Sequence, residues 1–204
     1  MHKNVNKFLQ AIIAFPVLAM SFTGAPFPGV TVGSPLAAAI SPDQTRTLSS
    51  VLADNKQQDI VEEAAKIDAY FAQYDLPMEG KGYKLAKAAS DNDLPPASLA
   101  AMAMIESTGG KFAYANNPFG YGNKVKFSSV DEAIDTVAKT LAAKNDATKD
   151  FYANKTFPQK IRVYNGPAVK ADPRYVAKVM WVMDQIDGMQ VPVETASASA
   201  ITKV

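Results

Sequence analysis

An apolar segment that ends in one carboxylate and two glycines most constrains how this chain folds. The segment Leu99–Glu106 is followed by Ser-Thr and then by Gly109-Gly110. Leu99, Met102 and Ala103 stand at helical spacing before Glu106, so an α-helix places all of them on one face. We therefore predict a core-facing helix that ends at the glycines and carries Glu106 on its buried side.

A carboxyl group in that position is expected to have a raised pKa. Burial disfavours the charged form, and the negative end of the helix dipole acts in the same direction. A carboxylic acid that stays protonated near neutral pH can donate a proton to a glycosidic leaving oxygen. The helix alone is equally compatible with a solvated glutamate that has no chemistry, so the assignment depends on the surrounding sequence.

Composition excludes several kinds of catalysis. The chain has 204 residues, no cysteine and a net charge of +1, and its single histidine is His2. Thiolate nucleophiles, serine–histidine pairs and histidine or cysteine metal sites are therefore excluded, and we expect no metal and no cofactor. The near-neutral charge gives no reason to expect a nucleic-acid partner.

The N-terminal residues are typical of an exported protein. Lys3 and Lys7 precede the mostly apolar segment 8–20, and small residues follow up to Ala37-Ala-Ala39. We predict that residues 1–39 are a signal peptide or an N-terminal membrane anchor, and that the protein lies in the cell envelope or outside the cell. The alternative is an ordinary N-terminal core helix.

The remaining chain reads as one mostly α domain. We predict a flexible linker over residues 40–58, a folded domain over 59–188 and a disordered tail over 189–204. Apolar periodicity and capping residues predict helices from about Asp59 to Leu76-Pro77, from Tyr83 to Ser90, after Pro95-Pro96, after Ser129, from Phe157 to Tyr164 and after Asp172-Pro173. Residues 111–128 have no period and are expected to form a loop or a short β-hairpin.

Several segments resemble the bacterial glucosaminidase family, also described as the mannosyl-glycoprotein endo-β-N-acetylglucosaminidase-like domain. The resemblance covers residues 62–187 and is carried by Ile105-Glu-Ser-x-Gly-Gly110, Asn116-Asn-Pro-Phe-Gly-Tyr-Gly122 and Ala171-Asp-Pro-x-Tyr175. It implies a lysozyme-like, α-rich fold in which the extended region directly follows the helix that carries the acid.

The resemblance also implies an activity. Glu106 would be the catalytic acid of an enzyme that cuts the β-1,4 bond after N-acetylglucosamine in the peptidoglycan glycan strand, and we expect that enzyme to be a monomer. Family members often carry a tyrosine just before the Asp-Pro segment, where this chain has Val169 or Lys170. Tyr164 or Tyr175 is then the candidate for that role.

A second resemblance keeps another enzyme class open. Tyr164-Asn-Gly-Pro167 is similar to a segment of the soluble lytic transglycosylases, which share the lysozyme-like fold and use one glutamate. The Gly-Leu-Met-Gln segment of those enzymes is absent here. The alternatives to a hydrolase are therefore a lytic transglycosylase and a wall-binding domain without turnover.

Hydrolysis usually needs a second carboxylate, and three acidic residues follow the loop. Of Asp131, Glu132 and Asp135, Glu132 fits the family position best, but it is also explained as the capping-box partner of Ser129. The candidate substrate-binding residues are Ser107, Asn117, Phe119, Tyr121 and Tyr175. Each has a structural alternative: a helix hydrogen bond for Ser107, a turn for Asn117, and packing for the aromatic rings, as we expect for Trp181.

Overall fold

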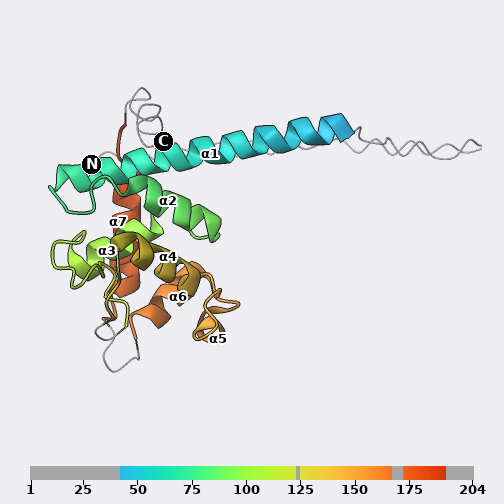
Figure 1. Ribbon diagram of the computed structural model, residues 1–204. Helices are drawn as coiled ribbons and strands as arrows, with labels where there is room; N and C mark the ends of the chain where they lie inside the picture. The colour runs from blue at the N-terminus through green and yellow to red at the C-terminus, as the bar shows by residue number, and fades with distance from the viewer. Residues whose placement is uncertain (1–41, 123–124, 167–171, 192–204) are drawn as a thin grey trace, which may run out of the picture. The chain divides into compact units, whose positions relative to one another are not determined.

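The computed structural model describes residues 42–122, 125–166 and 172–191, and it is mostly α-helical (Figure 1). No strand forms within these residues; one isolated antiparallel bridge joins Tyr114 to Asn117, so the expected loop is present and the hairpin is not. The helices within these ranges are α1 (Pro42–Gln73), α2 (Gly82–Asp91), α3 (Ser98–Ser107), α4 (Val130–Leu141), α5 (Lys149–Tyr152), α6 (Phe157–Tyr164) and α7 (Tyr175–Asp187).

The flexible linker predicted over residues 40–58 is wrong for residues 42–58, because these residues are helical. They form the first half of α1, and residues 48–59 are all exposed. The segment contains no glycine, and its one proline, Pro42, stands at the first helical position, where proline is tolerated. A polar segment without an apolar stripe can therefore continue a helix that is buried only farther along.

The second half of α1 contributes to the core. Ile60, Ala64, Ile67 and Phe71 recur at helical spacing and are buried where α1 packs against α2 and α7. Tyr74, which was expected on the same face, lies beyond the helix end and is 47% exposed. The apolar face therefore ends at the last turn of α1.

Helix α3 is the central element of the fold. Residues 98–103 are buried on all sides, because α3 packs against α2, α4 and α7, the last of which runs close to it in Figure 1. A helix that is apolar all round is expected in such a position. Any polar side chain near its end must therefore find a protein partner or an opening to solvent.

The later helices follow the predicted pattern with two corrections. The stripe of α4 (Ile134, Val137, Leu141) is fully buried, and α6 has its predicted bounds. Trp181, expected to pack in the core, is 58% exposed on α7, because Val179 and Val182 occupy the buried side of that helix. The short α5 was not predicted from the sequence.

The predicted N-terminal signal or anchor (residues 1–39) lies outside the described residues. Residues 192–204, which are most of the predicted tail, lie outside them as well. So do residues 167–171, which include Val169 and Lys170. Of the helices that the structure describes, none combines the length and the apolar character needed to span a bilayer.

Candidate functional site: a buried acid at the end of α3

The end of α3 is fixed by the turn between α1 and α2. Gly109 has a φ of +58°, and a β-carbon there would lie 2.8 Å from Cδ1 of Leu76. Its carbonyl oxygen accepts a hydrogen bond of 3.1 Å from the backbone N–H of Met78. Only glycine satisfies both the left-handed backbone and the close packing at this position. The predicted glycine stop therefore has a tertiary cause as well as a local one.

The loop after α3 folds back onto the helix end through Ser107. The Ser107 hydroxyl donates to the carbonyl of Pro118 at 2.7 Å and lies 3.2 Å from the carbonyl of Ala103, while it accepts from the N–H of Gly110 at 3.0 Å. Ser107 is buried, and these backbone contacts use its hydrogen-bonding capacity. It shapes the site and has little left to offer a ligand.

Asn117 also shapes the loop. Its amide nitrogen donates to the carbonyl of Tyr121 at 2.9 Å, and its amide oxygen accepts from the N–H of the same residue at 3.0 Å. Asn116 has a left-handed backbone, and its side chain donates to the carbonyls of Phe127 and Ser128. Both asparagines therefore stabilise the turn, which was the structural alternative for Asn117.

Glu106 is partly buried beside a tyrosine of α7. The hydroxyl of Tyr175 donates a 2.6 Å hydrogen bond to Oε1 of Glu106. Burial raises the pKa of Glu106 above its usual value, and the hydrogen bond from Tyr175 opposes that rise without cancelling it. Burial also raises the pKa of Tyr175, so the phenol keeps its proton and remains the donor. The acid is therefore oriented and biased toward its neutral form.

The second carboxyl oxygen, Oε2, faces a glycine. A β-carbon at Gly120 would lie 2.9 Å from Oε2, and Gly120 is exposed with a φ of +61°. Since Tyr175 occupies Oε1, the proton of the neutral acid belongs on Oε2. Gly120 has no side chain that would cover this oxygen, and both residues line the same pocket.

Glu106 lines a surface pocket of about 190 Å³, which we call the acid pocket. Glu106 is the only acidic side chain among the described residues that line it. Part of its wall is exposed to solvent, including Phe112 and Tyr114, which are 73% and 61% exposed. The lining residues are Glu106, Ser107, Phe112, Tyr114, Asn117, Gly120, Gly122 and Val125.

Tyr164 does not line the pocket but bonds to the loop that forms part of its wall. Its hydroxyl donates to the carbonyl of Phe119 at 2.8 Å, directly before Gly120. Burial raises the pKa of Tyr164 well above its usual value, and the neighbouring Glu106 carboxyl adds to that rise. Tyr164 is therefore a neutral donor that fixes the loop, while Tyr175 is the tyrosine that contacts the acid.

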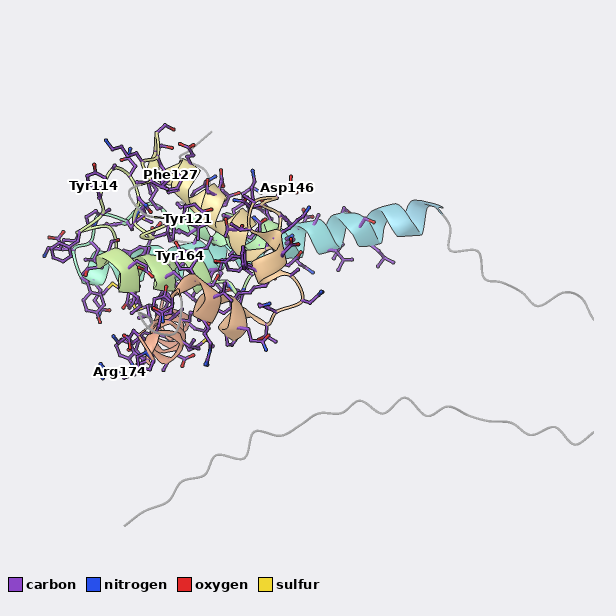
Figure 2. All side chains as sticks on the ribbon, turned by 90° about the horizontal axis from the view of Figure 1, so that it is seen from below. Tyr114, Tyr121, Phe127, Asp146, Tyr164 and Arg174 are labelled. Carbon is purple, nitrogen blue, oxygen red and sulfur yellow. The ribbon has the colours of Figure 1, made fainter. Side chains whose placement is uncertain are left out.

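The ring of Phe119 is fully buried in the core, so the packing alternative holds and Phe119 is no longer a substrate-binding candidate. A ring with no exposed face cannot stack on a sugar. Tyr121 is partly buried, with its ring 6.4 Å from that of Tyr164 and its hydroxyl bonded to Thr140. Figure 2 shows Tyr121 and Tyr164 near the middle of the folded part and Tyr114 at its edge.

Glu132 occupies the N-terminal cap of α4. Its Oε2 accepts from the backbone N–H of Ser128 at 2.7 Å and from the Ser128 hydroxyl at 2.6 Å, while its own N–H donates to Ser129 Oγ. These hydrogen bonds lower the pKa of Glu132. Ser129 caps α4 as predicted, but the Glu132 carboxylate bonds to Ser128, one residue before the N-cap, so the reciprocal half of the predicted capping box does not form. The structure thus brings Glu106, Tyr175 and the 116–121 turn together and places Glu132 in a different setting.

A second pocket also contains a glutamate with a raised pKa. It has a volume of about 320 Å³ and is lined by α1, α2 and residues 93–96, with Glu63 on its wall. Burial raises the pKa of Glu63, and its Oε1 is buried with no hydrogen-bond partner among the described residues. That oxygen has no donor to orient it and no exposure to a substrate. We therefore favour the acid pocket, although it is smaller.

Sequence reasoning missed Phe112, Tyr114 and the role of Gly120. The available signal was the pair of aromatic residues just after the glycines that follow the acid. Comparison of this chain with protein-family models, with characterised proteins and with solved structures gives no match. The site is therefore interpreted from its own geometry.

Proposed function

We propose that this protein is a peptidoglycan hydrolase with a lysozyme-like fold that cleaves β-1,4 bonds of the glycan strand, with Glu106 as the general acid. The observation that carries this proposal is the Glu106 carboxyl itself. It is partly buried with a raised pKa, its Oε1 is held by Tyr175, and its Oε2 lies beside Gly120, which lines the acid pocket together with Glu106. A neutral acid with one accessible oxygen is what protonation of a glycosidic oxygen requires.

The reaction follows from this arrangement. The proton on Oε2 passes to the glycosidic oxygen while the bond between that oxygen and C1 of the sugar breaks. Water then adds to the oxocarbenium-like C1 and loses a proton, which leaves a reducing N-acetylglucosamine end and regenerates the acid. Tyr175 stays bonded to Oε1 and stabilises the carboxylate that forms when Oε2 gives up its proton.

The single carboxyl in the acid pocket also favours a second candidate, a lytic transglycosylase. Glycosidases usually place two carboxyl groups about 5 to 9.5 Å apart, whereas the described lining of this pocket offers only Glu106. With one acid, either the substrate's acetamido group assists hydrolysis, or a hydroxyl of the sugar closes an anhydro ring. Both routes use Glu106 in the same first step.

The location and the partner are part of the same proposal. The basic residues and apolar segment within 1–39 support export, and the peptidoglycan glycan strand is the partner that the sequence resemblance suggests. A wall-binding domain without turnover remains the non-enzymatic alternative.

Product analysis tests the proposal. Purified peptidoglycan is digested with the wild-type protein, and the new sugar ends are identified by mass spectrometry before and after borohydride reduction. Reducing N-acetylglucosamine ends support the hydrolase, and anhydro-muramic ends support the transglycosylase. The matched control is Glu106→Gln, which keeps the shape of the side chain and removes the acid. Cleavage by this variant at the wild-type rate would contradict the role of Glu106.

A further inference from the structure

Two adjacent aromatic side chains on the wall of the acid pocket have no structural explanation within the described residues. Phe112, at 73% exposure, is the most exposed large apolar side chain in the described part of the chain, and Tyr114 is 61% exposed. Single exposed apolar residues are common on protein surfaces. Here two such residues, separated by only one residue, line the same pocket as Glu106.

A lysine accompanies this pair. The Nζ of Lys126 lies 5.9 Å from the centre of the Tyr114 ring, and Lys126 is exposed. Within residues 42–122, 125–166 and 172–191, neither Lys126 nor the neighbouring Lys111 forms a salt bridge. The rim therefore combines two aromatic faces with positive charge that no described carboxylate neutralises.

The backbone that presents these residues is fixed. Tyr114 and Asn117 form an antiparallel bridge, and the N–H of Phe127 donates to the carbonyl of Ala115 at 3.1 Å. The N–H of Phe112 donates to the carbonyl of Ser107 at 2.9 Å, which ties the aromatic pair to the end of α3. The rim is thus held at a set position relative to Glu106 before any ligand binds.

We propose that Phe112, Tyr114 and Lys126 form a subsite for an N-acetylmuramic acid ring of a glycan strand whose stem peptides have been removed, with Lys126 facing the free lactyl carboxylate. A pyranose ring has an apolar C–H face that suits an aromatic side chain and polar edges that remain in water. The lactyl carboxylate supplies a negative charge to pair with the lysine of the rim. The inference rests on the proposed glycan-cleaving function for its choice of ligand, and it adds a preference for muramic acid over a neutral chitin chain.

Binding without turnover tests the subsite separately from catalysis. The Glu106→Gln protein is titrated at pH 7, by isothermal titration calorimetry, with a tetrasaccharide that alternates N-acetylglucosamine and N-acetylmuramic acid and has free lactyl groups. The comparison ligand is the N-acetylglucosamine tetramer. We expect the alternating glycan to bind about threefold more tightly, as one partly exposed ion pair allows.

Three variants in the Glu106→Gln protein assign the contributions. Tyr114→Ala and Phe112→Ala are each expected to weaken the binding of both glycans about tenfold. Lys126→Gln is expected to remove only the preference for the charged glycan. The matched control is Phe151→Ala, which removes an aromatic side chain of α5 that is 63% exposed and does not line the pocket. Because these side chains are exposed, their removal should leave the fold intact.

The outcomes separate this inference from the proposed function. If the wild-type protein cleaves nothing but the variants change binding as expected, the subsite stands and the hydrolase proposal fails. If cleavage depends on Glu106 but Tyr114→Ala and Phe112→Ala bind like Phe151→Ala, the subsite is wrong. The subsite is also wrong if neither glycan binds. It is wrong as well if Tyr114→Ala abolishes self-association of the protein and leaves glycan binding unchanged.

Discussion

The end of α3 and the start of α4 each carry a glutamate that was a catalytic candidate. The pKa values of these two glutamates are shifted in opposite directions. Glu106 lies in the last turn of its helix, partly buried, and burial raises its pKa. Glu132 lies in the first turn of its helix, exposed, and hydrogen bonds from Ser128 lower its pKa. The helix dipole acts in the same two directions, against a negative charge at a C-terminus and in favour of one at an N-terminus. The same residue type is thus biased toward its neutral form in one place and toward its charged form in the other.

The largest expected effect comes from exchanging each glutamate for glutamine. Glu106→Gln should lower the rate of peptidoglycan cleavage by about 10³-fold, because the general acid is lost. Glu132→Gln should leave the rate within about twofold, because its carboxylate acts in the cap. Release of soluble fragments from purified peptidoglycan measures both rates. A large loss of activity in Glu132→Gln with an unchanged melting temperature would make Glu132 a second catalytic residue.

A smaller effect is expected from closing the space beside Oε2. In Gly120→Ala the new β-carbon would lie 2.9 Å from Oε2, so we expect cleavage to fall about 100-fold through displacement of the acid. Gly80→Ala is the matched control, because Gly80 also has a positive φ but no atom within 4 Å of the β-carbon position. Both variants share a backbone cost of about 1 to 2 kcal/mol. Equal activity in the two variants would mean that Oε2 is not the oxygen that reacts.

Removal of the tyrosine hydroxyl tests how the acid is oriented. Tyr175→Phe should lower kcat about tenfold, because Glu106 loses the bond that fixes Oε1. That bond lowers the pKa of Glu106, so the fall in kcat/KM at high pH should shift to higher pH in the variant. Tyr152→Phe removes the hydroxyl of another buried tyrosine, on α5, and should leave the pH profile unchanged. An unshifted profile in Tyr175→Phe would show that the bond does not control the acid.

The smallest effect, and the most direct test of the comparison, is the pH dependence of stability. Because the pKa of Glu106 is raised above 4.5 by folding, the wild-type protein loses stability as the pH rises through the folded-state pKa. Glu106→Gln should therefore be relatively more stable at pH 7 than at pH 4. The pKa of Glu132 is lowered from 4.5, so its contribution is present above that pH and lost as the pH falls. Glu132→Gln should be relatively less stable at pH 7 and nearly equal to wild type at low pH, as urea denaturation at each pH can measure. Changes of the same sign in both variants would contradict the contrast.

Local sequence signals predicted most of the helices and the raised pKa of Glu106, but they left the role of Glu132 open. The N-cap at Ser129, the bounds of α6 and the buried stripe of α4 follow from spacing that operates within a few residues. The same local reasoning gave the wrong result for residues 42–58, since a polar segment without helix breakers looks like a linker but can extend a helix that is anchored elsewhere. It also misplaced Trp181 and left the place of the Phe119 ring open, because exposure depends on which neighbouring elements cover a side chain.

The sequence by itself determined that any catalysis must use carboxylates, tyrosines, amides or lysines, that the chain is mostly helical and that Glu106 ends an apolar helix. These conclusions rest on composition and on periodicities that span one or two helical turns. Only the tertiary structure decided that Tyr175 and not Tyr164 contacts the acid, that Gly120 leaves Oε2 open and that Phe112 and Tyr114 wall the pocket. Tyr175 is 69 residues from Glu106, and no local rule sets which distant side chains meet when helices pack.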